Sequence, residues 1–221
     1  MTNSSQAAQT QAGDAISDRR LEPVSAADET RTQEQRYRSG AYGMLARLLR
    51  ASPDGAVLQQ VAGFTRVEPK QDELALAMSM LGLAASTSNP EAVDDEFHAL
   101  FIGIGRGELV PYGSWYLTGF LMERPFGRLR DDLTALGFHR QEGVAEPEDH
   151  VAALCEVMSI LIDEESDLRT QSQFFERHIA DWMERFFADL SEAGSAVFYR
   201  AVGRFGAAFV SLEQRYMSMP V

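Results

Sequence analysis

Apolar residues recur every three or four positions along most of this chain, which is the spacing of helices that bury one face. The first such run begins at Glu34 and carries Tyr37, Ala41, Met44 and Leu48. Similar runs follow almost to the C-terminal end, and no stretch alternates apolar with polar residues for long enough to form a strand. The pattern predicts helices over residues 34–49, 53–64, 74–86, 90–101, 115–122, 125–136, 147–162, 174–190 and 195–217.

The predicted fold is therefore all-α, a single-domain bundle of about eight or nine helices around one core. Residues 1–33 are rich in Ser, Thr, Gln, Ala and acidic residues and contain few large aliphatic ones. Such a composition cannot bury enough apolar surface to fold, so it predicts a disordered N-terminal tail. The helical domain is expected over residues 34–221.

Proline and glycine mark several predicted helix ends. Ser52 before Pro53, and Asn89 before Pro90, each combine a capping side chain with a proline at the first helical position. A proline costs nothing there, because the N–H that it lacks would have no partner in the helix. Gly103 is predicted to end the helix that Pro90 begins, since glycine readily adopts the left-handed conformation of a helix C-terminus.

Composition excludes several classes of protein. The chain has 221 residues, of which 45% are hydrophobic, so it can bury one sizeable core. Its single cysteine excludes an intramolecular disulfide framework, and the sequence contains no run long enough to span a bilayer and no apolar segment of a secretory signal. We therefore expect a cytoplasmic protein without stable membrane insertion.

The net charge of −13 changes the expected partners. Lys and Arg do not cluster densely anywhere, whereas phosphate binding needs a basic patch, so we expect no nucleic-acid partner. An acidic surface would attract basic peptides, although acidity also serves solubility alone.

Residues 96–150 hold most of the candidate chemistry, because glycine, proline and large aromatic residues are concentrated there. The loop Gly103-Ile104-Gly105-Arg106-Gly107 resembles a phosphate-binding loop, but it follows a predicted helix and lacks the usual lysine. We interpret it as a helix end and a turn. The segment Glu146-Pro147-Glu148-Asp149-His150 is predicted to begin a helix at Pro147, where carboxylates would complement the helix dipole. The dipole gives no reason for an imidazole at this position.

Catalytic and metal sites are not indicated. The other histidines, His98, His139 and His178, are isolated, and neither a His-Glu-x-x-His nor a Gly-x-Ser-x-Gly motif is present. Cys155 lies on the apolar face of its predicted helix and is interpreted as an inert core residue. We expect no enzymatic activity, no metal and no cofactor.

Aromatic residues form the last candidate constellation. The three- and four-residue spacing of Phe97 with Phe101, and of Tyr116 with Phe120, is typical of core positions. The segment Pro111-Tyr112-Gly113-Ser114 differs, because a loop that presents an aromatic between proline and glycine cannot bury it by helical periodicity alone. An apolar groove with a few polar groups is the usual form of a peptide-binding site.

Three of these motifs together resemble one family. Glu96-Phe97-x-x-Leu100-Phe101, then Pro111-Tyr112-x-Ser114-x-Tyr116, then Glu146-Pro147-x-Asp149-His150 are similar, in order and separation, to the hallmark motifs of the TorD/DmsD/NarJ group of redox enzyme maturation chaperones. The resemblance covers the chain from about Glu34 to the C-terminus. It implies an all-helical, non-enzymatic cytoplasmic chaperone for a molybdenum-cofactor oxidoreductase.

The resemblance also implies partners and site residues. Such chaperones bind the precursor of the catalytic subunit, often by its twin-arginine leader, assist cofactor insertion and prevent premature export; molybdenum cofactor delivery proteins are further possible partners. The residues that would line or support a leader groove are Phe97, Leu100, Phe101, Pro111, Tyr112, Ser114, Tyr116 and Tyr42. The acidic and histidine loop beside it would consist of Glu146, Glu148, Asp149 and His150.

The charge and polarity of a twin-arginine leader indicate the same kind of site. A leader presents paired guanidinium groups followed by an apolar segment, so its receptor needs carboxylates beside an apolar groove. Our hypothesis is that Glu146, Glu148 or Asp149 pairs with the leader arginines while the aromatics contact its apolar part. The alternatives are a chaperone that binds the body of a non-exported molybdoenzyme, for instance a formate dehydrogenase, a nucleotide-binding protein, or a helical interaction module whose loop aromatics are core.

Overall fold

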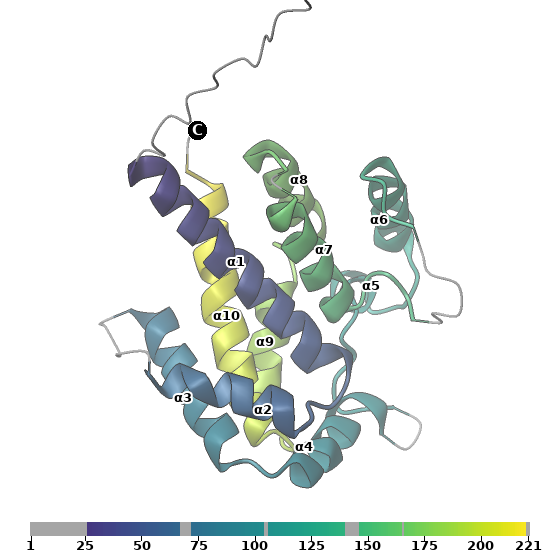
Figure 1. Ribbon diagram of the computed structural model, residues 1–221. Coiled ribbons are helices and arrows are strands. Elements are labelled where there is room, and N and C mark those ends of the chain that lie inside the picture. Colours follow the sequence, from purple (N-terminus) through teal and green to yellow (C-terminus); the bar gives the residue numbers. More distant parts are fainter. Residues whose placement is uncertain (1–25, 67–71, 104–105, 140–145, 165, 220–221) are drawn as a thin grey trace, which may run out of the picture.

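The computed structural model describes residues 26–66, 72–103, 106–139, 146–164 and 166–219, and within these ranges every named element is helical (Figure 1). The all-α prediction is confirmed. The α-helices are α1 (Ala26–Arg50), α2 (Gly55–Ala62), α3 (Glu73–Thr87), α4 (Pro90–Phe97), α5 (Gly113–Thr118), α6 (Arg124–Ala135), α7 (Val151–Asp163), α8 (Leu168–His178), α9 (Met183–Glu192) and α10 (Phe198–Met217).

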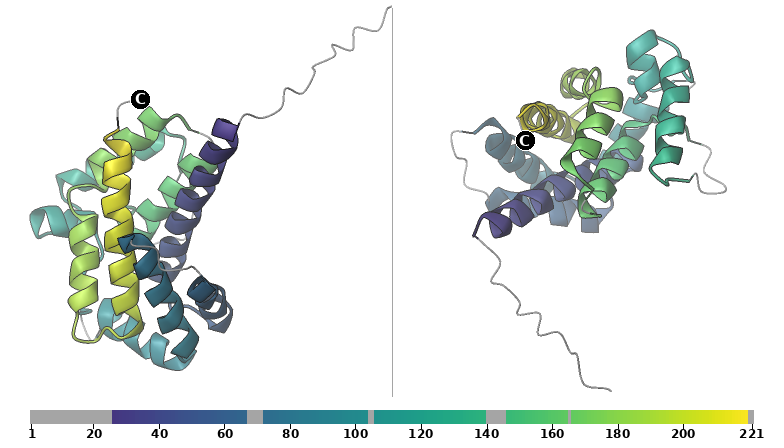
Figure 2. Two further views of the ribbon diagram at one scale, coloured as in Figure 1. Left: turned by 90° about the vertical axis from the view of Figure 1, so that its left-hand side faces the viewer. Right: turned by 90° about the horizontal axis from the view of Figure 1, so that it is seen from above.

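Helix α10 runs through the middle of the molecule and packs against α9, α3 and α1 (Figure 2). Glycine lets α9 approach it closely. A Cβ at Gly206 would lie 2.3 Å from the Phe187 ring, and one at Gly203 would lie 2.6 Å from the backbone nitrogen of Ser191. Any larger residue at either position would force the two helices apart.

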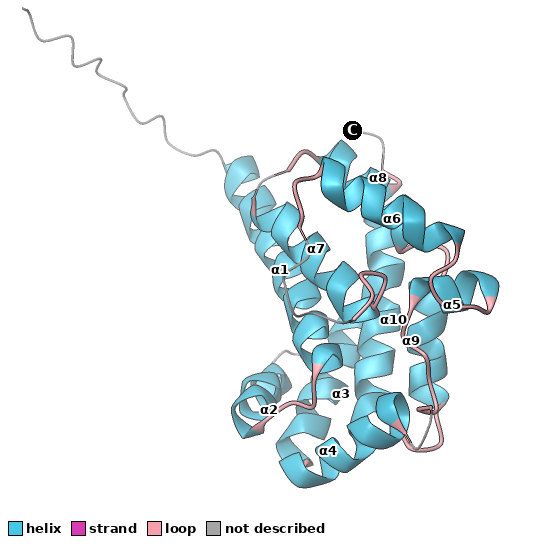
Figure 3. Cartoon of the chain, turned by 90° about the vertical axis from the view of Figure 1, so that its right-hand side faces the viewer, coloured by secondary structure: helices cyan, strands magenta, loops and turns pink. Residues whose placement is uncertain are grey.

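Helices α1 and α7 form the second closely packed pair, on the other side of α10 from α9 (Figures 1 and 3). A buried ion pair ties α1 to α10. Arg38 donates from Nε to Glu213 Oε1 at 2.7 Å and from Nη2 to Oε2 at 2.9 Å, and a third nitrogen donates to Gln171 of α8 at 3.0 Å. Arg38 and Glu213 are 4% and 0% exposed, so this bidentate pair is sealed from water.

The first sequence motif forms a tight corner. After α4 the chain makes a short π-helical segment, His98–Ile102, and turns at Gly103 with φ of 58°. A Cβ at Gly103 would lie 2.1 Å from the Arg106 carbonyl oxygen, so the predicted glycine helix end is confirmed and has a steric reason. Glu96, just before this corner, accepts hydrogen bonds at 2.7, 3.0 and 2.7 Å from three consecutive backbone N–H groups at the start of α10, those of Val197, Phe198 and Tyr199.

Some predicted helix ends were right and others wrong. Asn89 caps α4, with Pro90 in the first turn, as predicted. Ser52 does not cap α2, because Asp54 accepts from the Val57 N–H and the helix starts only at Gly55. Helix α1 begins at Ala26, inside the segment predicted to be a tail; the rest of that prediction, residues 1–25, lies outside the described residues.

Two predicted helices have different bounds in the structure. The helix predicted over 174–190 is divided at Ile179–Trp182 into α8 and α9, which accounts for part of the difference between the ten α-helices of the described ranges and the eight or nine expected. The helix predicted over 115–122 ends at Thr118, because Gly119 takes φ of 80°. Phe120, predicted to be core, is consequently 68% exposed. Cys155 is fully buried, as predicted, and burial raises the pKa of its thiol.

Helix α6 lies at the edge of the molecule, outside the α1–α7 pair (Figure 1). It buries Leu129 and Leu133 and is joined to α8 through Asp132, which contacts His178 at 2.7 Å and Arg177 at 3.0 Å. None of the helices in the described ranges is long and apolar enough to cross a membrane.

The buried Arg38–Glu213 pair generates a stability prediction. Glu213→Gln should lower the free energy of unfolding by about 3 kcal/mol, because a buried guanidinium loses its counter-charge. Replacing both partners, as Arg38→Met with Glu213→Leu, should cost less than the single change. Urea unfolding followed by circular dichroism measures both, with Arg47→Gln on the exposed side of α1 as the control. A loss under 0.5 kcal/mol for Glu213→Gln would contradict this account of the pair.

Candidate functional site

The second and third motifs are joined through their backbones. Tyr112 and His150 form an isolated antiparallel bridge. The Gly113 N–H donates to the Asp149 carbonyl oxygen at 2.9 Å, and the Val151 N–H donates to the Pro111 carbonyl oxygen at 2.9 Å. Two segments that are far apart in the sequence therefore form one unit between α5 and α7.

Asp149 fixes the start of α5. Its Oδ2 accepts from the Ser114 N–H at 2.8 Å, in the first turn of α5, where the helix dipole favours a negative charge. The residue is only 4% exposed. Ser114 is also buried, and its Oγ accepts from the Met122 N–H at 3.1 Å, which holds the turn after α5. Both side chains thus organise the chain around the second motif.

His150 is the N-cap of α7. The helix begins at Val151, so the predicted start at Pro147 was wrong, and the acids of this segment precede the helix instead of occupying its first turn. The His150 Nδ1 accepts from the Ala152 N–H at 3.1 Å, which places the proton of the neutral ring on Nε2. Burial, together with the charge of Arg50, lowers the pKa of His150 to about 4, so the ring is neutral at pH 7. A neutral ring accounts for an imidazole at a helix N-terminus.

Tyr112 and Glu146 complete this unit. The Tyr112 hydroxyl donates to Glu146 Oε1 at 3.2 Å, and its ring meets the His150 ring edge to face with the centroids 5.1 Å apart. Burial and the Glu146 carboxylate raise the pKa of Tyr112 to about 12. The His150 Nε2 lies 3.5 Å from the same Glu146 oxygen. Glu146 is therefore oriented by two aromatic side chains at the edge of a cavity.

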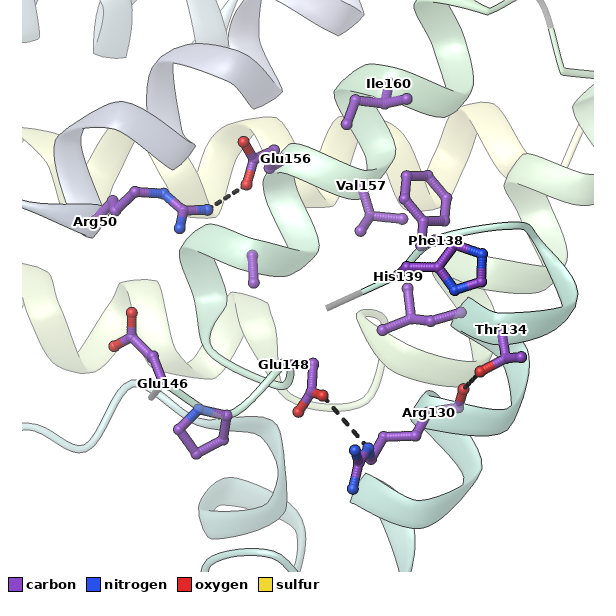
Figure 4. Close-up of a pocket in the computed structure, with 13 residues that line it drawn as sticks. Arg50, Arg130, Thr134, Phe138, His139, Glu146, Glu148, Glu156, Val157 and Ile160 are labelled. Carbon is purple, nitrogen blue, oxygen red and sulfur yellow. Dashed lines mark hydrogen bonds and ion pairs between the residues drawn. The ribbon is translucent and has the colours of Figure 1, made fainter. Parts of the chain in front are cut away.

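That cavity, of about 370 Å³, lies between α6 and α7 (Figure 4). Its lining combines apolar side chains with three carboxylates and two guanidinium groups. The lining residues are Arg50, Arg130, Leu133, Thr134, Phe138, His139, Glu146, Pro147, Glu148, Ala153, Glu156, Val157 and Ile160. A volume of this order suits a ligand side chain or short segment.

Two ion pairs stand on the cavity wall (Figure 4). The Arg130 Nε lies 3.4 Å from Glu148 Oε1, which connects α6 to the segment before α7. Arg50, the last residue of α1, pairs through Nη2 with Glu156 of α7. The cavity lining thus combines charges of both signs with apolar side chains that include Leu133, Val157 and Ile160.

Of the residues predicted for the site, some line the cavity and others are buried. Glu146 and Glu148 line the cavity, whereas Asp149 and His150 are buried behind it. None of the eight predicted groove residues lines this cavity. Tyr42, Phe97 and Leu100 belong to the core, Pro111 and Ser114 are buried, and the partly buried Phe101, Tyr112 and Tyr116 pack against neighbouring rings. Their direct contact with a ligand stays a prediction.

Sequence reasoning missed the cavity residues Arg50, Arg130, Phe138 and Glu156. The apolar face of the helix at 147–162 was recognised, but Glu156 lies on its other face, where any charged residue would serve as solvated surface. No local pattern distinguishes it from its neighbours. Among the described residues there is no group of three or more His, Cys, Asp or Glu side chains that could hold a metal ion.

Comparison with known proteins identifies a family whose model matches this chain. Residues 67–188, more than half of the chain, match the model of a family described as nitrate reductase delta subunit. This range contains the three motifs and every cavity residue except Arg50.

Several curated relatives carry the name chaperone protein TorD. The chain is 27% identical over 130 residues to that of Vibrio cholerae serotype O1, an alignment that covers 54% of this chain and 59% of the relative. It is 26% identical over 172 residues to that of Shewanella loihica, covering 75% of this chain and 80% of the relative. Among solved structures, a redox enzyme maturation protein from Archaeoglobus fulgidus matches with a TM-score of 0.52 at 19% identity, over 80% of this chain and 93% of that chain, which supports the fold.

The burial of His150 predicts a pH effect on stability. Below pH 6.5 the unfolded chain takes up a proton that the folded His150 accepts only near pH 4, so stability should fall as the pH drops through this window. At about 1.4 kcal/mol per pH unit the loss should be of the order of 3 kcal/mol. His150→Asn keeps a capping acceptor but cannot titrate. Urea unfolding between pH 7.5 and 4.5 should show the wild type losing stability relative to this variant; a constant difference would contradict the prediction.

Proposed function

The chain belongs to the nitrate reductase delta subunit family, and we propose that it is a cytoplasmic chaperone that binds the precursor of a molybdoenzyme catalytic subunit. The proposed contact is the twin-arginine leader of that precursor. Holding the leader would delay export until the cofactor has been inserted. In this proposal the protein binds and releases its partner without catalysing a reaction.

The observation that carries the proposal is the cavity between α6 and α7. Its lining combines the carboxylates of Glu146, Glu148 and Glu156 with aliphatic and aromatic side chains. A leader offers paired guanidinium groups followed by an apolar, helix-prone segment, so the two surfaces are complementary in charge and in polarity. The names of the TorD relatives support the same class of function.

Charge supports this choice of ligand. A net charge of −13 steers cationic peptides toward the protein and raises their rate of association. The neutral His150 adds no positive charge beside Glu146 at pH 7. The neighbouring imidazole therefore does not weaken the attraction of this carboxylate for a guanidinium.

The buried motif residues have a different part in the proposal. Asp149 is 4% exposed and already accepts from the Ser114 N–H, so the leader arginines would pair with carboxylates that line the cavity, Glu146 and Glu148 among them, and not with Asp149. Asp149, His150 and Tyr112 hold the segment that presents these carboxylates. This division narrows the three carboxylates considered from the sequence to the two that line the cavity.

Calorimetric titration with leader peptides of candidate molybdoenzymes tests the proposal. We expect binding that weakens as salt is raised and shows a negative heat-capacity change, because it combines exposed charges with apolar burial. The double variant Glu146→Gln with Glu148→Gln should bind the best leader about tenfold more weakly, which is about 1.4 kcal/mol. Glu192→Gln, an exposed change at the C-terminal end of α9, is the matched control and should bind as the wild type does.

The opposite result is equally informative. If no leader binds but a leaderless apoenzyme does, the protein is a chaperone of the enzyme body, and the leader assignment is wrong. If the double variant and Glu192→Gln bind a leader equally well, Glu146 and Glu148 are not its receptor.

A further inference from the structure

The two ion pairs of the cavity differ in kind from the buried pair of the core. Arg38 and Glu213 use two nitrogens and two oxygens at 2.7 and 2.9 Å, away from water. In the Arg130–Glu148 pair the Arg130 Nε lies 3.4 Å from Glu148 Oε1, and the arginine side chain is 54% exposed whereas the glutamate side chain is 17% exposed. The Arg50–Glu156 pair also uses one nitrogen and one oxygen, and both of its side chains are about half exposed.

Exposed pairs of this kind contribute little to stability. Their contribution is small because water and salt screen the attraction and two long side chains lose freedom. A guanidinium that reached the same carboxylate in the bidentate arrangement, with less contact with water, would bind it more strongly. Exchanging one arginine for another at these carboxylates therefore costs the protein little.

We propose that Arg50 and Arg130 occupy, in the unliganded protein, the positions of two arginines of the bound segment. On binding, the ligand guanidinium groups replace them at Glu156 and Glu148, and the displaced arginines turn toward solvent. This inference rests on the proposed function. It adds Glu156 to Glu146 and Glu148 as a third arginine-binding carboxylate of the cavity, at a position that none of the sequence motifs contains.

The positions of the residues allow such an exchange without unfolding. Arg50 is the last residue of α1, so its side chain leaves the helix end freely. Arg130 lies on α6, which stays attached through the buried Leu129 and Leu133 and through the contact of Asp132 with His178. The carboxylates of the two pairs face one cavity from α7 and from the segment before it (Figure 4).

The exchange explains why the ligand would be arginine and not lysine. A lysine ammonium is a compact charge and cannot form the paired, planar contact that distinguishes a ligand guanidinium from the single contacts already present. Two neighbouring arginines would meet two carboxylates, whereas one arginine would leave the second internal pair closed.

The test uses a synthetic twenty-residue peptide that contains Ser-Arg-Arg followed by a Leu- and Ala-rich segment, titrated calorimetrically into the full chain. Removing an internal competitor should strengthen binding, so Arg130→Gln and Arg50→Gln should each bind the peptide about two- to fivefold more tightly. Arg128→Gln is the matched control, since it removes the same charge from an exposed position of α6 that does not line the cavity. It should change the affinity by less than 1.5-fold.

The complementary variant is Glu156→Gln. It should weaken binding of the Arg-Arg peptide at least threefold, and it should have a smaller effect on a Lys-Lys version of the same peptide. Tighter binding by Arg130→Gln together with weaker binding by Glu156→Gln would establish the exchange.

Each failure has its own meaning. If the wild type binds the peptide but Arg130→Gln is no tighter than Arg128→Gln, the exchange is wrong while the proposed function stands. An unchanged affinity in Glu156→Gln removes that residue from the site. If the wild type binds no Arg-Arg peptide at all, the leader assignment and the exchange are both wrong.

Discussion

Two helix starts in this molecule, those of α5 and α10, depend on acceptors supplied by segments that are distant in the sequence. Every helix leaves its first N–H groups without a partner inside the helix, and a small bundle of many short helices has many such groups. Glu96 provides both oxygens to three consecutive N–H groups at the start of α10, and Asp149 provides one to α5. These contacts fix Glu96 to the start of α10, which packs against α9, α3 and α1, and fix Asp149 to the start of α5.

The chemistry of the site follows from this arrangement. Motif residues that hold helix starts are buried and already hydrogen-bonded, so they present neighbouring residues instead of meeting a ligand themselves. The bridge between Tyr112 and His150 holds the segment from which Glu146 and Glu148 line the cavity, and α7 contributes Glu156 to the same lining. A receptor for a cationic peptide needs carboxylates that remain accessible, and these three are the ones that line the cavity.

The buried ion pair of the core and the two ion pairs at the cavity belong to different classes. The Arg38–Glu213 pair is bidentate and sealed, so removing one partner leaves an uncompensated charge. The pairs at the cavity make single contacts in partly exposed positions, where water can replace either partner. Burial therefore distinguishes the ion pair that maintains the fold from the ion pairs at the cavity, although the sequence shows the same residue types in both.

The sequence alone determined the all-α class, the cap of α4 by Asn89, the turn at Gly103 and the order of the three motifs, because each of these is written in local spacing or in the conformational limits of single residues. It also identified the segment of Glu146 and Glu148. Only the tertiary structure decided that Asp149 is buried while Glu148 lines a cavity, that Phe120 is exposed, and that Arg50, Arg130 and Glu156 line the same cavity. Those outcomes depend on which helices come together, and residues 50, 130 and 156 have no local pattern that distinguishes them from ordinary surface charges.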